Sequence, residues 1–388
     1  MGIIFSSFNG LEPRLRFNEF IENWERYEAE EIFQNITDKN HPDDIVLTIQ
    51  QGKGTLPREL SGRNILYDNT NTKNYKRVKF GDFIIHLRSF EGGLEIANEQ
   101  GIVSPAYTIL RHKKNIAFGF YKAYFRTNEF INHVLSKSVE GIRDGKQISY
   151  DAFKWLSIPY CKLEEQQKIA DFLSLVDQRI EKQRQLVESL KKYKRGYFQR
   201  IISAFNTHEY MVSDIVEEYN KKTKIQHEYP ILSSTMSGIK LQNDYFNKQA
   251  ASEDTVGYKI VPSGYFTYRS MSDTGEFHFN LQDVIENGIV SPAYPVFKVI
   301  GNNSEFVEYI LNETDEIKSQ LLIKKEGGTR YALSFSKFKS LKICLPTLEV
   351  QDKFVTQLNM IDNLLYIEAK TYDNLQRMKK GFLQQMFI

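Results

Sequence analysis

The chain contains one unit of sequence twice, and this duplication limits the folds that it can adopt. The segment Gly-Ile-Val-Ser-Pro-Ala-Tyr at residues 101–107 returns unchanged at residues 288–294, 187 residues later. Near the end of each copy, residues 194–199 match residues 379–384 with an offset of 185. Because the offset drifts by only a few residues, the copies are two versions of one unit with small loop differences. A period this long indicates a duplicated domain and not a solenoid of short repeats.

Both copies have the same internal order. Short β-like runs broken by turns come first, such as residues 83–87 in the first copy and 265–268 in the second. Each copy then ends in a long amphipathic stretch, residues 163–202 and 348–387, with glycine only near its end. A helix of about 39 residues would be about 58 Å long.

Apolar residues recur in these stretches with alternating spacings of four and three, the pattern of a coiled-coil seam. Each seam position in the second stretch lies 185 residues after one in the first. The predicted seam consists of Ile169, Leu173, Val176, Ile180, Val187, Leu190, Phe354, Leu358, Ile361, Leu365, Tyr372 and Leu375. Polar residues interrupt it at matching places, Gln183 with Glu368 and Lys194 with Lys379. Polar seam residues tend to fix register and partner choice at some cost in stability.

These patterns predict a mixed α/β (α+β) protein with two globular domains in a pseudo-two-fold arrangement. The two long helices are expected to separate the domains and to pair as an antiparallel intramolecular coiled coil. The predicted boundaries are 1–162 for the first domain, 163–205 for the first long helix, 206–347 for the second domain and 348–388 for the second long helix.

Composition narrows the class of protein. No run of about 18 apolar residues occurs, so no membrane-spanning helix is expected, and the start of the chain lacks the features of a secretory signal. Two cysteines among 388 residues cannot form a disulfide framework or a cysteine-rich metal site. We therefore expect a cytoplasmic protein. The net charge is only +2, but basic clusters such as residues 73–79 and 191–195 make nucleic acid a candidate ligand.

The sequence predicts no catalytic residue, no metal ligand and no cofactor bound by this chain. Residues 141–147 lack the spacing of a phosphate-binding loop, and the seven histidines form no HExxH pair. The Ser-Pro-Ala-Tyr of each duplicated segment is similar to the Pro-Pro-aromatic motif with which amino-methyltransferases hold a flipped base. It lacks the second proline and a glycine-rich cofactor loop before it, so a turn that leads into a strand is the better interpretation. Cys161 and Cys344 precede the long stretches at matching places and are expected to be buried.

Several segments carry a resemblance to a known family. They are residues 13–17, 159, 163–173, 194–199, 346–351 and 379–387. Their order, duplication and spacing resemble the conserved regions of type I restriction–modification specificity subunits, and the likeness spans essentially the whole chain. One departure is Val350, where the first copy has Glu165, and it leaves open what the glutamate does.

This resemblance implies a DNA-recognition subunit without catalytic activity of its own. Each target-recognition domain would read one half of a bipartite double-stranded DNA target, while the helices would set the unread gap and dock two methyltransferase subunits. Restriction subunits would complete a complex that is an adenine-N6 DNA methyltransferase and an ATP-dependent endonuclease. S-adenosylmethionine, ATP and Mg would then be bound by the partner subunits. Because residues 25–80 and 209–262 are dissimilar, we expect an asymmetric target.

Two other functions remain compatible with the sequence. An interaction scaffold would hold two protein-binding domains apart on a coiled coil without any role in DNA binding. The second is a self-contained modification enzyme, and the missing cofactor motif argues against it.

Candidate DNA contacts are chosen from side-chain chemistry alone, as polar and basic residues in turn-rich segments. Arginine can pair bidentately with guanine, whereas lysine more often holds phosphate. In the first domain the candidates are Lys53, Arg58, Arg63, Lys73, Lys76, Arg77 and Arg88. In the second domain they are Lys221, Lys222, Lys224, Ser234, Thr235, Arg269 and Arg330.

Overall fold

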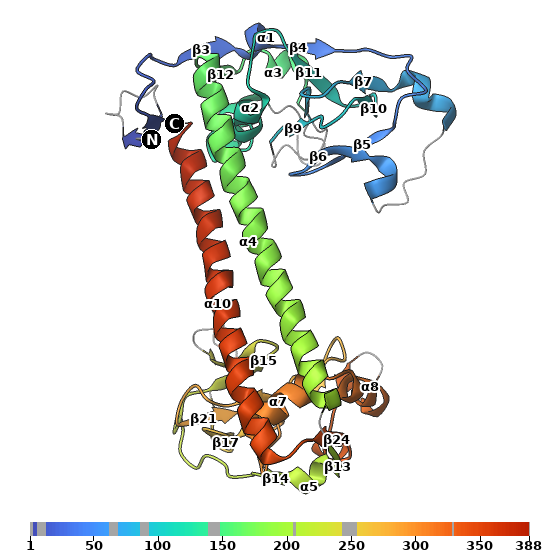
Figure 1. Cartoon of the computed structure of the whole chain (residues 1–388), viewed down its shortest axis with the longest axis vertical. Coiled ribbons are helices and arrows are strands. Elements are labelled where there is room, and N and C mark those ends of the chain that lie inside the picture. Colours follow the sequence, from blue (N-terminus) through green and yellow to red (C-terminus); the bar gives the residue numbers. More distant parts are fainter. Residues whose placement is uncertain are drawn as a thin grey trace. The chain divides into compact units, whose positions relative to one another are not determined.

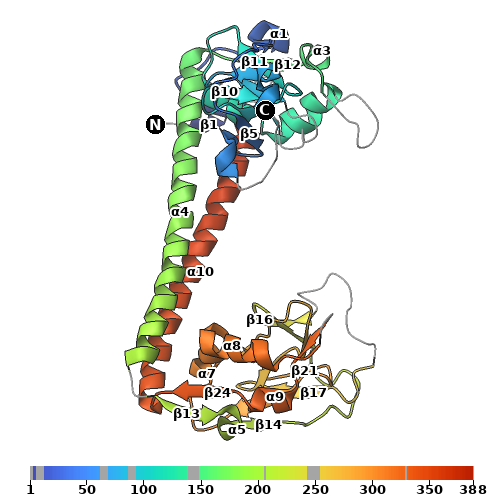
Figure 2. The same ribbon diagram turned by 90° about the vertical axis from the view of Figure 1, so that its right-hand side faces the viewer.

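The structure is a computed structural model, and it describes residues 3–5, 13–61, 69–85, 93–138, 148–204, 207–242, 254–327 and 330–387. Contacts divide the chain into two units: unit 1 holds residues 1–185 and 369–388, and unit 2 holds residues 186–368. Each unit therefore combines one globular α/β domain with a segment of both long helices, α4 (Leu163–Ala204) and α10 (Leu348–Gln385) (Figures 1 and 2). No helix in the described ranges is long and apolar enough to cross a membrane.

The domain of unit 1 is built on a four-stranded antiparallel sheet. Its strand order is β4 (Phe33–Ile36), β11 (Thr108–His112), β8 (Phe83–Ile85) and β9 (Glu95–Ile96). Two-stranded pairs accompany it: β1 (Ile3–Phe5) with β2 (Leu15–Phe17), β3 (Glu25–Glu28) with β12 (Ser157–Tyr160), β5 (Leu47–Gln50) with β6 (Gly54–Pro57), and β7 (Lys76–Val78) with β10 (Gly101–Val103). The helices are α1 (Ala29–Ile32), η1 (Arg58–Ser61), η2 (Asn69–Asn74), α2 (Phe118–Tyr124), η4 (Phe130–Val134), η5 (Leu135–Ser138) and α3 (Tyr150–Phe153).

The domain of unit 2 repeats the four-stranded sheet and three of the strand pairs in the same order, and its described residues add the pair β19–β23. Its sheet runs β14 (Val216–Glu218), β22 (Val296–Val299), β18 (Phe266–Thr267) and β20 (Asn280–Leu281). The two-stranded pairs are β13 (His208–Met211) with β24 (Lys342–Leu345), β15 (Leu232–Thr235) with β16 (Gly238–Leu241), β17 (Lys259–Pro262) with β21 (Asn287–Val290), and β19 (Met271–Ser272) with β23 (Tyr331–Ala332). The shorter helices are α5 (Val212–Ile215), α7 (Ser304–Glu313), α8 (Asp315–Lys324) and α9 (Phe335–Lys339).

The duplicated heptapeptide is a turn between two strands in both domains, as the sequence predicted. In the first copy, Gly101 begins β10, the backbone N–H of Tyr107 closes a turn onto the carbonyl of Ser104, and β11 follows. A Cβ atom on Gly101 would lie 2.7 Å from Cγ of Leu47 on the hairpin β5–β6. A Cβ on Gly288 would lie 2.5 Å from Cγ of the corresponding Leu232. The glycine is therefore required because a hairpin leucine packs directly on the backbone in each domain.

Aromatic side chains form much of both cores, and the long helices extend these cores. In unit 1 the rings of Phe83 and Phe125 lie 5.0 Å apart, and Phe387 of the chain end lies 5.0 Å from Phe120. In unit 2 the rings of Phe279 and Phe338 stack at 4.7 Å. Buried aromatic rings remove large apolar areas from water, so these clusters supply much of the driving force for folding.

A buried glutamine fixes the first turn of each long helix to its own domain. The Gln166 side chain accepts the backbone N–H of Ala117 at the start of α2 (3.0 Å) and donates to the carbonyl of Cys161 (2.7 Å). Gln351 likewise accepts the N–H of Asn303 at the start of α7 (2.9 Å) and donates to Pro346 (2.8 Å). Both side chains are fully buried, so the repeated Leu-Glu-x-Gln pattern is a structural joint.

The structure also explains why the second copy has valine beside this glutamine. Glu165 is buried and receives two hydrogen bonds from the guanidinium of Arg16, at 2.7 and 2.8 Å, and one from the indole of Trp24 at 3.1 Å. Val350 instead packs against the apolar core of unit 2. The glutamate thus holds the N-terminal segment of the chain to α4.

Within each unit the two long helices lie side by side in antiparallel orientation. In unit 1 the Phe172 ring lies 5.1 Å from that of Phe382, and Asp177 pairs with Lys379 at 2.5 Å. In unit 2, Lys194 pairs with Asp362 at 2.6 Å. The predicted seam residues Ile169, Leu173, Val187, Phe354 and Leu358 are buried, and Val176, Ile180, Leu190, Ile361, Leu365, Tyr372 and Leu375 are half-buried. The two ion pairs are equivalent in sequence, because Lys194 corresponds to Lys379 and Asp362 to Asp177. Each seam lysine therefore pairs with an aspartate of the other helix.

Candidate nucleic-acid interface

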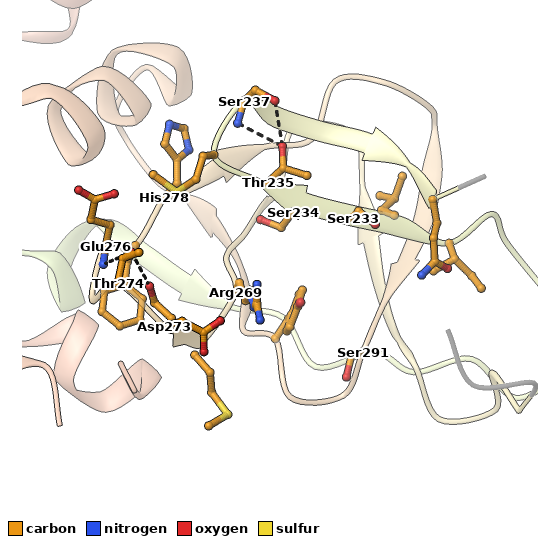
Figure 3. Close-up of a pocket in the computed structure, with 18 of the residues that line it drawn as sticks. Ser233, Ser234, Thr235, Ser237, Arg269, Asp273, Thr274, Glu276, His278 and Ser291 are labelled. Atoms are coloured by element: carbon orange, nitrogen blue, oxygen red, sulfur yellow. Dashed lines mark hydrogen bonds between the residues drawn. The ribbon is translucent and has the colours of Figure 1, made fainter. Parts of the chain in front are cut away.

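A groove of about 850 Å³ opens in the second domain between the hairpin β15–β16 and the segment that follows β18 (Figure 3). Three of the predicted DNA contacts, Ser234, Thr235 and Arg269, line it together. The other lining residues include Ser233, Met236, Tyr258, Asp273, His278, Ser291 and Tyr294. The groove is therefore concave and rich in hydrogen-bonding groups, and it presents one free cation among the described residues that line it.

Arg269 is exposed in this groove, and its guanidinium has no ion-pair or hydrogen-bond partner among the described residues. Its backbone is nevertheless held on both sides. The fully buried Tyr268 donates its hydroxyl to the carbonyl of Leu333 at 3.1 Å, and Ser270 donates its hydroxyl to Ala293 at 2.9 Å. Because the backbone is already fixed, only the side chain of Arg269 has to be ordered on binding, which favours a specific contact.

The hairpin edge of the groove is fixed by a buried amide. Asn280, 1% exposed on β20, donates to the hydroxyl of Ser234 at 2.7 Å and to the carbonyl of Thr235 at 2.9 Å. The ring of His278 donates to the oxygen of the same amide at 2.7 Å. Burial lowers the pKa of His278, so the ring favours its neutral form in the groove.

Other candidates in the second domain lie outside this group. Arg330 is exposed and pairs with the groove residue Asp273 at 3.0 Å, which engages its guanidinium. Lys221, Lys222 and Lys224 are exposed, but they do not line the groove. The structure therefore brings Ser234, Thr235 and Arg269 together and leaves the lysine cluster apart from them.

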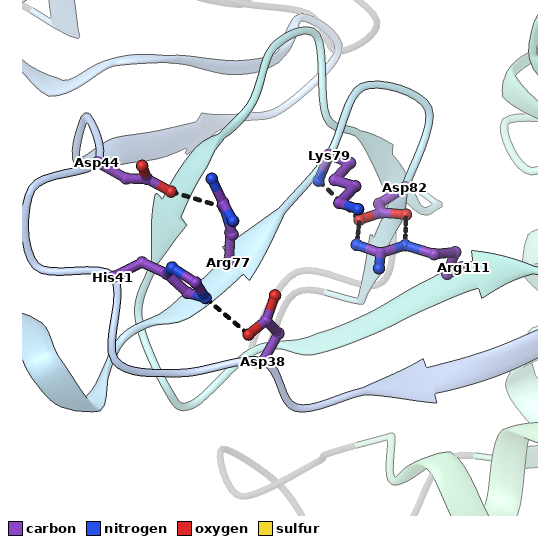
Figure 4. A network of polar contacts seen from close by, with 7 residues as sticks. All are labelled: Asp38, His41, Asp44, Arg77, Lys79, Asp82 and Arg111. Atoms are coloured by element: carbon purple, nitrogen blue, oxygen red, sulfur yellow. Dashed lines mark hydrogen bonds and ion pairs between the residues drawn. The ribbon is translucent and has the colours of Figure 1, made fainter.

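Candidates in the first domain differ in the exposure of their side chains and in the contacts that these already make. Lys53, at the tip of the hairpin β5–β6, and Lys73 have exposed side chains, and Arg58, which begins η1, is half-buried. Lys76 donates to the carbonyl of Tyr107 at 2.6 Å, and burial lowers its pKa. Arg77 pairs with Asp44 at 2.8 Å (Figure 4). Lys76 and Arg77 are thus engaged within the domain. Arg63 and Arg88 lie outside the described residues.

Ion pairs near Arg77 tie the loops of the first domain to its sheet (Figure 4). The guanidinium of Arg111 on β11 donates to both carboxylate oxygens of the buried Asp82, at 2.8 and 2.6 Å. His41 contacts Asp38 at 2.7 Å. Because bidentate arginine–carboxylate pairs are geometrically specific, these contacts orient loops and leave Asp82 and Arg111 little capacity for an external ligand.

Sequence reasoning missed two neutral residues that shape the groove, the buried Asn280 and the half-buried His278. A buried polar residue in a short strand has no signature in composition or charge. The duplicated heptapeptide did carry a signal for two groove residues, because Ser291 and Tyr294 both belong to it. Among the described residues, no group of three or more His, Cys, Asp or Glu side chains is arranged to hold a metal ion.

Comparison with known proteins gives a consistent result. A protein of Methanocaldococcus jannaschii named as the specificity subunit of the type I restriction enzyme MjaX is 24% identical over 349 residues, which cover 79% of this chain and 77% of that protein. The solved type I restriction–modification S subunit from M. genitalium has the same fold, with a TM-score of 0.55 at 16% identity over 97% of this chain and 99% of that chain.

A second solved chain, from a study of complex assembly and conformational transition in the type I R-M system, gives a TM-score of 0.56 at 15% identity, covering 94% of this chain and 97% of that chain. The type I restriction modification DNA specificity domain matches residues 21–192 and again residues 205–377. These two matches coincide with the two copies that the duplication predicted. The chain therefore belongs to the type I restriction modification DNA specificity family, with two specificity domains in one polypeptide.

Proposed function

We propose that each domain of this chain reads one half of a bipartite, asymmetric DNA target, as the non-catalytic recognition subunit of a type I restriction–modification complex. The observation that carries the proposal is the exposed, backbone-anchored Arg269 in a polar groove of a DNA specificity domain. Arginine is suited to this role because two of its five N–H groups can donate together to the O6 and N7 acceptors of guanine. The hairpins of the two domains differ in sequence, which supports two different half-sites.

The long helices would set the gap between these half-sites. At about 1.5 Å per residue, helices of 42 and 38 residues are about 63 and 57 Å long. At about 3.4 Å per base pair, these lengths correspond to about 17 to 19 base pairs of DNA. A rigid spacer makes the distance between half-sites part of the specificity.

Catalysis and cofactor binding are assigned in this proposal to partner subunits. Two methyltransferase subunits would dock on the exposed faces of the helices and use S-adenosylmethionine to methylate adenine. Restriction subunits would supply ATP- and Mg-dependent translocation and cleavage. The complex would act in the cytoplasm, where bacterial and archaeal chromosomes lie.

Methylome sequencing of a host with and without this gene tests the function directly. We expect a bipartite adenine-methylated motif that is present only with the gene and its methyltransferase partner. A host that carries the partner alone is the control, because it should lack the motif. An unchanged methylome, together with the absence of sequence-specific DNA binding by the co-expressed subunits, would favour the interaction scaffold instead.

A further inference from the structure

A buried carboxylate accepts hydrogen bonds from the backbone of the turn in the hairpin β5–β6 of the first domain. Glu95, 3% exposed on the edge strand β9, accepts the backbone N–H of Gly52 at 2.7 Å and that of Gly54 at 3.0 Å. The guanidinium of Arg126 donates to the same carboxylate at 2.8 Å. Three charge-assisted hydrogen bonds therefore converge on one side chain, and two of them fix the backbone on either side of Lys53.

The carbonyl of Lys53 is held as well. The amide of Asn98 donates to it at 2.7 Å and to the carbonyl of Thr55 at 2.8 Å. Gly52 and Gly54 have φ values of +81° and +83°, and a Cβ atom on Gly54 would lie 2.4 Å from the carbonyl oxygen of Ile96. Only glycine fits this backbone without strain. The backbone of Lys53 is thus fixed on both sides, while its side chain is exposed.

The second domain fixes the same hairpin from the same position with different chemistry. In strand pairing, Glu95 lies opposite Ile84, and Asn280 lies opposite the corresponding residue Thr267. Asn280 holds the turn of β15–β16 through Ser234 and Thr235. The turns themselves differ: residues 50–54 are Gln-Gln-Gly-Lys-Gly, and residues 235–238 are Thr-Met-Ser-Gly. The two domains share a fixed turn and differ in the side chains that it presents.

We propose that the hairpin β5–β6 enters the major groove of the first half-site, that Lys53 contacts a guanine there, and that Glu95 and Asn98 are positioning residues for this contact. The inference rests on the proposed function and assigns the residues that perform it in the first domain. A two-stranded ribbon fits the major groove, and lysine can donate to the O6 and N7 acceptors of guanine. A fixed backbone favours this contact because ordering a flexible turn on binding would cost conformational entropy and lower the affinity for DNA.

The test selects bound sequences from a pool of random DNA duplexes with the full chain and its co-expressed methyltransferase partner, and sequences them. The variants are Lys53→Ala, Asn98→Ala, Glu95→Gln and the double variant Lys53→Ala/Asn98→Ala. Lys137→Ala, which removes an exposed lysine from η5 of the same domain, is the matched control. Thermal unfolding of each variant identifies any that fail to fold, and Asn98→Ala keeps the test valid if Glu95→Gln does not fold.

We expect Lys53→Ala to reduce discrimination at one guanine of the first half-site by about tenfold and to leave the second half-site unchanged. Asn98→Ala and Glu95→Gln should weaken discrimination at that same position, and the double variant should be no worse than Lys53→Ala alone. Such non-additivity distinguishes positioning from a general loss of stability. Lys137→Ala should select the wild-type motif.

Three results would overturn the inference while leaving the proposed function intact. The first is an unchanged motif in Lys53→Ala. The second is a loss of affinity in Lys53→Ala that is even across sequences and comes with a smaller salt dependence, because this is the sign of a phosphate contact. The third is additive effects of the two substitutions in the double variant. If the wild-type complex itself enriches no motif, the proposed function fails and this inference fails with it.

Discussion

At the scale of single residues, Arg269 is expected to specify one base of the second half-site. Its guanidinium is free among the described residues and its backbone is anchored through Tyr268 and Ser270. Arg269→Ala should therefore cost about 1–3 kcal/mol of discrimination at one guanine and relax that position of the methylated motif. Arg330→Ala is the matched control, because Arg330 already pairs with Asp273. An evenly weakened but unaltered motif in Arg269→Ala would assign this residue to phosphate.

Glu165 is expected to matter for stability and not for recognition. Glu165→Val introduces the residue type found in the second copy but leaves the buried guanidinium of Arg16 without its carboxylate. Removing one partner of a buried ion pair costs about 3–5 kcal/mol, so the denaturant midpoint should fall clearly. Val350→Ala, at the equivalent half-buried position, should cost far less. Adding Arg16→Met to Glu165→Val should recover part of the loss, and a double variant that unfolds as early as the single one would contradict this account.

At the scale of elements, the two reciprocal ion pairs of the long helices provide an internal comparison. Lys194 and Lys379 each pair with an aspartate of the other helix. Lys194 also lies 4.5 Å from the centre of the Tyr309 ring, and the hydroxyl of Tyr309 donates to the same Asp362. Lys194→Ala should therefore destabilise the protein by about 0.5–1 kcal/mol more than Lys379→Ala. Chemical denaturation of both variants and of Tyr309→Phe measures this difference, and equal losses for the two lysines would refute a contribution from the ring.

The elements also show what the sequence could predict. The duplication and the long helices were predictable because heptad spacing is a local pattern, and this chain repeats it with a constant offset. The contacts of basic residues were not, because they depend on distant partners: Asp44 engages Arg77, and the carbonyl of Tyr107 engages Lys76. The prediction that both cysteines are buried was wrong for Cys344, which is exposed, whereas Cys161 is buried. Cys344 alternates with the buried Ile343 and Leu345 on β24, so strand periodicity places it outward.

At the scale of the whole molecule, the proposed spacer role predicts that helix length sets the gap in the DNA target. Residues 183–189 of α4 and 368–374 of α10 are sequence-equivalent, and they lie between the ion pairs Asp177–Lys379 and Lys194–Asp362. Deleting both heptads keeps the seam in phase and removes about 10.5 Å from each helix. At about 3.4 Å per base pair, the methylated motif should lose about three base pairs from its gap, with both half-sites unchanged.

The control for this deletion exchanges the two heptads with each other, which alters the same positions but preserves helix length and seam phase. Its motif should keep the wild-type gap. Deleting only one heptad should instead destabilise the protein, because the remaining helix can no longer match its partner along the antiparallel seam. Sequencing the methylated sites of all three variants separates length from composition. A double deletion that folds, methylates DNA and keeps the original gap would show that something other than the helices measures the distance between half-sites.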